Sequence, residues 1–322
     1  MHLHVPNSAF LHNIENFINR IEGERNGELR ITFHPKWVSI HPVILSMLAC
    51  RGQQEILKGN KVIIEYEKMR SLPYLIRMKL FDYLEEEMEI NIMEHESSGR
   101  FIPITNVRCS EDLGRFITDM IPLLHSSQDK VEPIQYVISE LVRNVLEHSE
   151  SIDGAYVSAQ LYPKRNRISI GVADSGKGIR KSMELFHLVE DDLSAIIKAL
   201  IPGITGTTHR FGGSEENAGA GLFFIKSIAT LNRDHFFIYS GNSYFKLRKV
   251  PLGKDIILQS DSNMDYSTVS NESGFWQGTA VGIDISLDRL SDFQQLLSEI
   301  RKAYSFRQKQ EEKKRYKRLV FK

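Results

Sequence analysis

The chain has 322 residues, of which 41% are hydrophobic, enough length and apolar content for two ordinary folded cores. Lys and Arg number 41, as do Asp and Glu, so no net charge favours nucleic acid or an anionic membrane. The two cysteines, Cys50 and Cys109, form neither a disulfide framework nor a metal-ligand spacing. No stretch resembles a secretion signal or approaches the roughly 20 apolar residues of a membrane span. We therefore expect a folded, cytoplasmic protein.

The first hundred residues alternate between strand-like and helix-like patterns. Residues 29–33 and 61–66 are rich in β-branched side chains, and residues 42–51 and 72–86 have helical periodicity. Strands that alternate with helices favour a parallel sheet buried under those helices. The sequence therefore predicts a small α/β domain over residues 1–98, ending near a small polar cluster at 97–100.

A longer helical pattern lies further along the chain, behind a leading helix expected over residues 111–124. Apolar residues at positions 137, 138, 141, 142, 145 and 146 follow the spacing of one helix face. Glu140, Asn144 and His148 recur every four residues, so we expect them along one edge of this helix. The carboxylate and the amide, on one edge of the helix, are suited to a ligand-binding site. His148 lies at the end of the helix, where its ring is expected to satisfy the last backbone carbonyls.

A second polar cluster follows a predicted strand over residues 167–173. Asp174 comes directly after this strand, and Gly176 and Gly178 follow it. A carboxylate at a strand end can accept a hydrogen bond from an exocyclic amine such as that of adenine. Glycines beside it allow a flat ring to approach the backbone.

Two glycines, Gly219 and Gly221, open an apolar helix that continues with Leu222. Bare backbone N–H groups at the positive end of a helix can bind phosphate oxygens. Further along this helix, Lys226 is expected to be exposed to solvent.

The last part of the chain is divided into an insert, a strand and a tail. Residues 252–278 are rich in turn-forming residues and predict an exposed excursion before a strand at 280–285. Residues 301–322 carry ten Lys or Arg residues against two Glu residues, a local charge near +8. We expect a basic helical tail over 291–322, which nucleic acid or an acidic protein could bind, although a solvated helix end is the simpler interpretation.

Taken in order, these segments resemble the Bergerat-fold ATPases, the superfamily of gyrase, heat-shock-ninety chaperones, histidine kinases and mismatch-repair ATPases. The resemblance covers residues 131–287, about half of the chain. It implies a two-layer α/β sandwich over residues 99–290 that binds ATP and Mg²⁺.

The resemblance also implies a role for each matching residue. Asn144 would ligate Mg²⁺, Glu140 would orient or deprotonate the attacking group, and Asp174 would read the adenine amine. Residues 179–218 would form a mobile lid, in which Arg210 is the best candidate to grip the γ-phosphate. The remaining nucleotide contacts would come from Gly176, Gly178, Gly219, Gly221, Leu222 and Thr279.

The sequence does not decide which branch of the superfamily the chain resembles most. The run 221–225 resembles the second glycine box of anti-sigma-factor serine kinases, whereas the run 172–179 resembles the histidine-kinase version. The N-terminal pattern loosely resembles the STAS-like domains that partner anti-sigma kinases. No histidine phosphoacceptor segment precedes the ATPase region, since His95 is followed by Glu-Ser-Ser-Gly.

Three functions therefore remain. In the first, the chain is an ATPase that drives a conformational switch or self-association. In the second, it is a serine or threonine kinase acting on a protein partner or its own N-terminal domain. In the third, it is a nucleotide-switched binding module. The first is preferred because no acceptor segment can be named.

Overall fold

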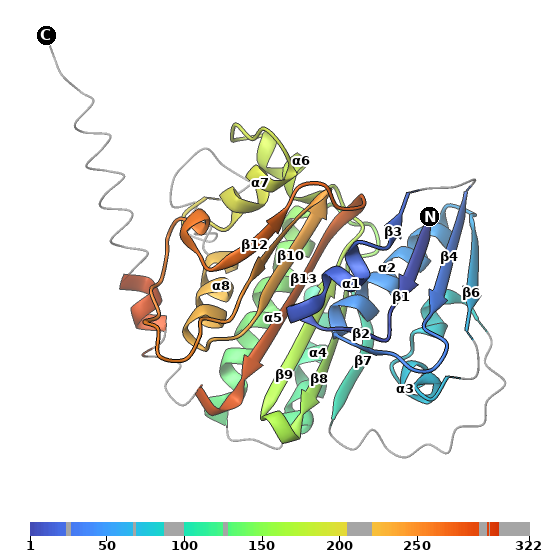
Figure 1. The fold of residues 1–322 in the computed structure, drawn as a ribbon, viewed down its shortest axis with the longest axis horizontal. Coiled ribbons are helices and arrows are strands. Elements are labelled where there is room, and N and C mark those ends of the chain that lie inside the picture. Colours follow the sequence, from blue (N-terminus) through green and yellow to red (C-terminus); the bar gives the residue numbers. More distant parts are fainter. Residues whose placement is uncertain are drawn as a thin grey trace, which may run out of the picture.

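The computed structural model describes residues 1–23, 27–66, 69–86, 100–124, 128–204, 221–289, 295 and 297–302. The chain is a mixed α/β protein with a small mixed sheet at the N-terminus and a larger antiparallel sheet packed against helices (Figure 1). The predicted boundary between residues 98 and 99, and most of the basic tail, lie outside the described residues.

The small sheet has the strand order β3-β1-β4-β6. Its strands are β1 (His2–Val5), β3 (Ile21–Glu22), β4 (Glu28–Phe33) and β6 (Lys61–Glu65). The two strands predicted from the sequence, β4 and β6, are parallel to each other, and β1 is parallel to β4. The sheet is mixed because β3 runs antiparallel to β1. A two-stranded sheet of β2 (Ser8–Ala9) and β5 (Ser39–Ile40) and the short helix α1 (Glu15–Ile18) complete this part.

The main helix of the N-terminal unit is α2 (Pro42–Leu57). It begins at His41, whose Nδ1 accepts a hydrogen bond from the Val43 backbone N–H at 3.1 Å, and a proline stands at its first position. The prediction of a second helix over residues 72–86 is wrong in its length. Helix α3 ends at Arg77 (Leu72–Arg77), and Lys79 takes a left-handed conformation with φ of 59° before a 3₁₀ turn at Phe81–Leu84.

The large sheet has seven antiparallel strands in the order β12-β11-β10-β13-β9-β8-β7. They are β7 (Phe101–Val107), β8 (Ala155–Tyr162), β9 (Arg167–Ala173), β10 (Phe236–Gly241), β11 (Ser243–Leu247), β12 (Ser267–Ser270) and β13 (Trp276–Ser286). Strand β12 lies within residues 252–278, and it pairs with β11. The expectation that this whole insert is an exposed excursion is therefore wrong, because its second half adds an edge strand to the sheet.

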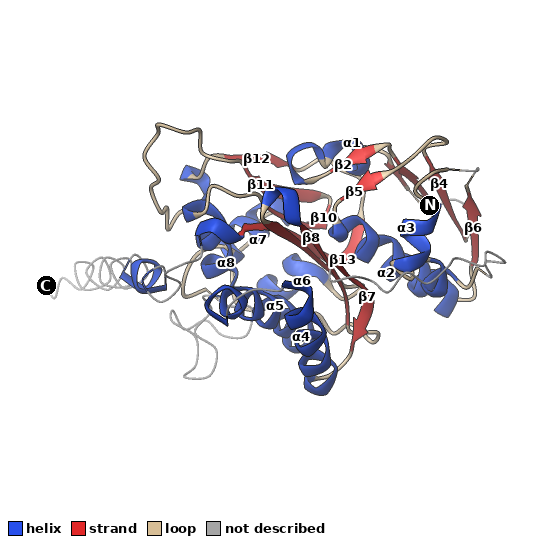
Figure 2. Cartoon of the chain, turned by 90° about the horizontal axis from the view of Figure 1, so that it is seen from below, coloured by secondary structure: helices blue, strands red, loops and turns tan. Residues whose placement is uncertain are grey.

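Helices cover one face of the large sheet, as Figure 2 shows from below, and long ones among them pack with its strands in one core. They are α4 (Ser110–Leu124), α5 (Gln128–His148) and α8 (Gly221–Leu231), close to the helices expected from periodicity. Helices α6 (Gly178–Glu184) and α7 (Asp192–Ala199) follow β9 and pack on each other. Residues 297–302 are helical: Leu297 and Ile300 are buried in this helix-side core, whereas Arg301 and Lys302, the described residues of the basic stretch 301–322, are exposed.

The opposite face of the large sheet is covered by the N-terminal unit. Side chains of β10 alternate between two cores: Phe236 and Ile238 pack with the helices, whereas Phe237 and Tyr239 pack with the N-terminal unit. The large sheet is therefore a middle layer. The two-layer arrangement expected from the resemblance is present as sheet and helices, and the N-terminal unit adds a third layer.

Helix α2 approaches the middle layer through glycines. A Cβ at Gly171 of β9 would lie 2.1 Å from the Val43 backbone nitrogen, too close for any side chain. Beside this contact, the hydroxyls of Ser46 and Ser158 lie 3.0 Å apart, and Ser46 also donates to the Gly171 carbonyl at 3.1 Å. The close approach and these buried hydrogen bonds fix α2 against β8 and β9.

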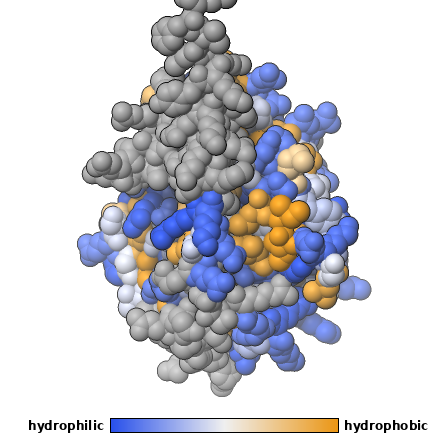
Figure 3. Space-filling view, turned by 90° about the vertical axis from the view of Figure 1, so that its left-hand side faces the viewer, coloured by the Kyte–Doolittle hydropathy of each residue, from blue (hydrophilic) through white to orange (hydrophobic). Residues whose placement is uncertain are grey.

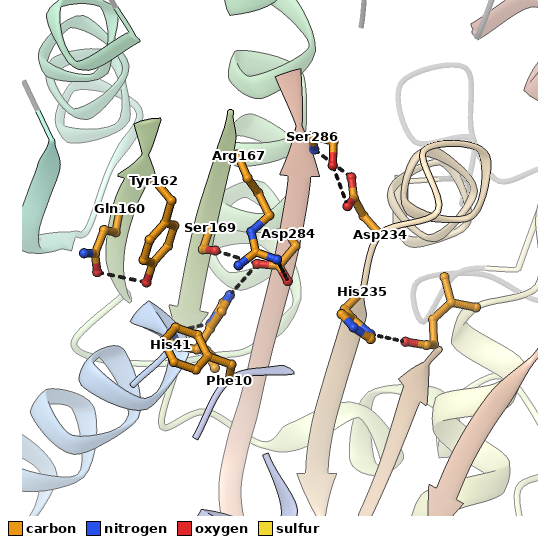
Figure 4. A network of polar contacts seen from close by, with 12 residues as sticks. Phe10, His41, Gln160, Tyr162, Arg167, Ser169, Asp234, His235, Asp284 and Ser286 are labelled. Atoms are coloured by element: carbon orange, nitrogen blue, oxygen red, sulfur yellow. Dashed lines mark hydrogen bonds and ion pairs between the residues drawn. The ribbon is translucent and has the colours of Figure 1, made fainter. Parts of the chain in front are cut away.

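A buried polar network joins the same two layers (Figure 4). Asp284 of β13 lies 3.5 Å from His41 Nε2 and 3.4 Å from Arg167 Nη1, and it accepts a hydrogen bond from Ser169 Oγ at 2.5 Å. Burial alone would raise the pKa of Asp284, but hydrogen bonding and charge from His41, together with Arg167 and Ser169, hold it well below its usual value. The network therefore contains a paired, ionised carboxylate.

Candidate functional site

A cavity of about 430 Å³ opens on the helix-covered side of the large sheet, within the usual size of small-molecule sites. It lies among α5, α6, the start of α8 and the strands β9 and β13. Seven of the predicted site residues line it: Glu140, Asn144, Asp174, Gly178, Gly221, Leu222 and Thr279. Two others, Gly219 and Arg210, lie outside the described residues. The structure therefore brings together groups that are up to 139 residues apart in sequence.

Helix α5 supplies the polar wall of the cavity. Its apolar face, including Leu141 and Val142, is buried in the core, which turns Glu140, Asn144 and His148 toward the cavity. The Asn144 side-chain nitrogen is buried and has no hydrogen-bond partner among the described residues. A buried amide without a partner is costly, so this atom marks a place where a ligand would be stabilised.

Glu140 is held against the first residue of α8. A Cβ at Gly221 would lie 2.6 Å from Glu140 Oε2 and 3.8 Å from Asn144 Nδ2, so a side chain there would displace the end of Glu140 but would leave Asn144 in place. Burial raises the pKa of Glu140, Arg143 lowers it, and Glu147 raises it. The carboxyl group is thus partly removed from water and placed at the N-terminus of a helix.

Asp174 lies at the end of β9 and is 1% exposed. Its Oδ1 accepts a hydrogen bond from the Gly176 N–H at 2.8 Å, and its backbone N–H donates to the Thr279 carbonyl at 2.9 Å. Burial raises the pKa of Asp174 to about 7, although the backbone hydrogen bonds of Gly176 and Thr279 oppose the shift. The group can therefore accept or donate a hydrogen bond near neutral pH.

The turn after Asp174 is clamped between α5 and β13. A Cβ at Gly176 would lie 2.1 Å from the Ser149 carbonyl oxygen, and that oxygen accepts from the Lys177 N–H at 2.7 Å. On the other side, the Gln277 side-chain amide donates to the Gly176 carbonyl. Gly176 thus shapes the site from behind, because it does not line the cavity itself.

Ser240 is a positioning residue that the sequence did not indicate. Its hydroxyl accepts from the Ile179 N–H at 3.0 Å and donates to the Gly278 carbonyl at 2.7 Å, which ties the start of α6 to β13. Gly178 and Gly278 both have positive φ, +79° and +90°, and a Cβ at Gly278 would lie 2.1 Å from the Asp174 carbonyl oxygen. Nothing in the apolar run of β10 distinguishes this serine.

His148 contributes both to the end of helix α5 and to the cavity. Its carbonyl accepts from Ser182 Oγ at 3.1 Å, and its ring interacts with the backbone of Glu147 in the last turn of α5. The ring lines the cavity, its Nδ1 has no partner among the described residues, and burial lowers its pKa.

The expectation that Lys226 is exposed is wrong: its side chain is 1% exposed, and its Nζ lies 2.6 Å from Asp265 Oδ2. This lysine anchors the insert and does not face the cavity.

A second, smaller cavity of about 200 Å³ lies beside the insert and contains none of the predicted site residues. Ile257 and Met264 line it and are well exposed, as is Leu252 nearby in sequence. Figure 3 shows an apolar area among polar side chains on the left-hand face of the view in Figure 1. The larger cavity remains the candidate site because polar groups from several elements converge on it.

No protein-family model matches this chain, and a search of curated proteins found no match. None of the described helices is long and apolar enough to cross a membrane. Within the described ranges, no group of three or more His, Cys, Asp or Glu side chains could hold a metal ion. A metal at this site would therefore depend on Asn144 together with oxygens of a bound ligand.

Proposed function

We propose that the chain binds Mg²⁺-ATP and hydrolyses it slowly to drive a conformational or regulatory switch. The observation that carries this proposal is the convergence of Glu140, Asn144, Asp174 and Gly221 on one cavity. An antiparallel sheet with helices packed on one face supports the resemblance to Bergerat-fold ATPases.

The donor set at the phosphate end fits Mg²⁺. This ion prefers oxygen ligands and is commonly held by one or two protein groups plus phosphates and water. Asn144 would supply one oxygen, while its partnerless nitrogen would donate to a phosphate. When bound, Mg²⁺ neutralises negative charge on the phosphates. The N–H groups at the start of α8 would contact phosphate oxygens beside Gly221.

Glu140 is the residue proposed to act on the attacking group. It lies one helical turn from Asn144 and close to Gly221, so a water between the carboxylate and a terminal phosphate would be oriented by it. Phosphoryl transfer depends mainly on positioning and charge neutralisation, and this site provides one acid and backbone donors for that purpose.

Asp174 is proposed to recognise adenine. Its buried carboxyl group would accept a hydrogen bond from the exocyclic amine, and the apolar side chains of Val172, Ile179 and Val281, which line the cavity, would pack on the ring. The clamp on the turn at Gly176 keeps this carboxyl group in place without a ligand.

The layer arrangement bears on the phosphoryl acceptor. The cavity lies on the helix side of the large sheet. The N-terminal unit covers the opposite face (Figure 2). A hydroxyl of the N-terminal unit would have to reach across the sheet within the same chain. This arrangement favours water or a separate protein as acceptor.

A kinase acting on a separate protein is the second candidate, because the run 221–225 resembles that of anti-sigma-factor kinases. Incubation of the purified chain with γ-labelled ATP and Mg²⁺ separates the two. Free labelled phosphate, lost in Glu140→Ala while nucleotide binding is retained, is the expected result. Label on protein would favour the kinase, and unchanged hydrolysis by the Glu140 variant would remove that residue from its role.

A further inference from the structure

Arg143 is the only Lys or Arg among the described residues that line the cavity. It stands three positions after Glu140 on α5, so the two side chains lie on the same helix face. The distance from Arg143 Nη1 to Glu140 Oε1 is 3.5 Å. Its side chain is 59% exposed, whereas that of Glu140 is 24% exposed. An exposed cation thus reaches inward to a largely buried acid.

The two carboxylate oxygens of Glu140 have different neighbours. Oε1 lies 3.5 Å from Arg143 Nη1, and Oε2 lies 2.6 Å from the place that a Cβ of Gly221 would take. The guanidinium therefore holds the plane of the carboxylate, with one oxygen toward Arg143 and one toward the start of α8. Without it, this plane could turn about the last side-chain bond, whose torsion is broad.

We propose that Arg143 is the positioning residue for Glu140: its guanidinium holds the carboxylate in the orientation that points one oxygen at the turn at Gly221. The role of Glu140 in turnover rests on the proposed function, but the pairing itself does not. Because Arg143 is exposed, the strength of its ion pair with Glu140 depends on the salt concentration.

The groups around Glu140 determine the pKa that a titration of this residue measures. On α5 it faces Tyr136, Arg143 and Glu147, and α8 presents the uncharged Gly221. Arg301 of the C-terminal helical residues interacts electrostatically with Tyr136. Arg143 lowers the pKa of Glu140 and Glu147 raises it, so removal of Arg143 leaves burial and Glu147, both of which favour the protonated acid.

The experiment is a pH titration of the full chain with ¹³C-carboxyl-labelled glutamate, in which the Glu140 signal is assigned by its loss in Glu140→Gln. Arg143→Met should move the titration midpoint of Glu140 to higher pH, and Arg143→Lys should move it less. The matched control is Arg115→Met, which removes the same kind of i,i+3 pair, with Asp112 on α4, and should leave the midpoint unchanged. An unchanged midpoint in Arg143→Met would overturn the proposal.

Turnover supplies a second readout. In Arg143→Met, the acid side of the pH profile of ATP turnover should move to higher pH, with KM for ATP nearly unchanged. A higher KM at every pH, with no shift of the profile, would mean that the guanidinium binds phosphate instead, which also contradicts the proposal. If wild type neither binds nor hydrolyses ATP, the proposed function fails, while the carboxylate titration still decides the pairing.

Discussion

His41 Nε2 lies 3.5 Å from Asp284 Oδ1, and this contact joins the N-terminal unit to the central strand β13 of the large sheet. The His41 Nδ1 accepts from the Val43 N–H, so the other ring nitrogen, Nε2, is the one that faces Asp284 with a proton. The same strand carries Thr279 at the cavity. One strand thus contacts both the N-terminal unit and the candidate nucleotide site.

Asp284→Ala should lower the free energy of unfolding by about 3–5 kcal/mol, because it leaves the buried His41 and the largely covered Arg167 without their carboxylate partner. The measurement is urea unfolding at pH 7, with the exposed Asp255→Ala as control. The pKa of Asp284 is lowered in the folded state, so its contribution is present above the unfolded pKa of 3.8 and is lost as pH falls through the folded value. Equal stability of the two variants would contradict this account of the network.

Asp174→Asn should stabilise the empty protein at pH 8. Burial raises the pKa of Asp174 to about 7, so between pH 4 and 7 the folded state keeps a proton that the unfolded state releases, and wild-type stability falls as pH rises. Three pH units at about 1.4 kcal/mol each set an upper limit near 4 kcal/mol. Unfolding curves of wild type and variant at pH 4 and 8 test this, since the difference should vanish at the lower pH.

The same variant should reduce the preference for ATP over GTP, because the neutral amide changes the hydrogen bonding offered to the exocyclic amine. Competition binding with the two nucleotides measures this preference. Unchanged discrimination would count against Asp174 as the adenine contact.

Gly221→Ala should lower ATP turnover at least tenfold while nucleotide binding is retained, because the new Cβ would lie 2.6 Å from Glu140 Oε2 and displace that side chain. The matched control is Gly114→Ala on α4, where a Cβ meets nothing within 4 Å and should slightly stabilise the helix. Release of labelled phosphate measures turnover in both variants. Wild-type turnover in Gly221→Ala would show that the start of α8 has more room than the structure gives it.

Periodicity was sufficient for the elements that carry the site. The apolar spacing of α5 and the β-branched run of β9 are local signals, and they place Asn144 and Asp174 correctly on a helix edge and at a strand end. The third layer could not be predicted in this way. Consecutive apolar residues in β10 indicate burial on both faces but not that the N-terminal unit provides the second cover.

Long-range polar pairing was equally inaccessible. Lys226 looks like a solvated helix residue because its partner, Asp265, is 39 residues further along the chain. Ser240 positions the start of α6 through a hydrogen bond to Ile179, 61 residues away. Such pairs depend on the completed fold, so neither composition nor local spacing carries a signal for them.

Calorimetry with Mg²⁺-ATP on wild type and Asn144→Ala tests most directly whether the residues that meet at the cavity form an ATP site. The account predicts Mg²⁺-dependent binding of ATP to wild type and none to the variant, with both proteins equally folded by circular dichroism. Absence of heat with wild type, or equal binding by the variant, would contradict it.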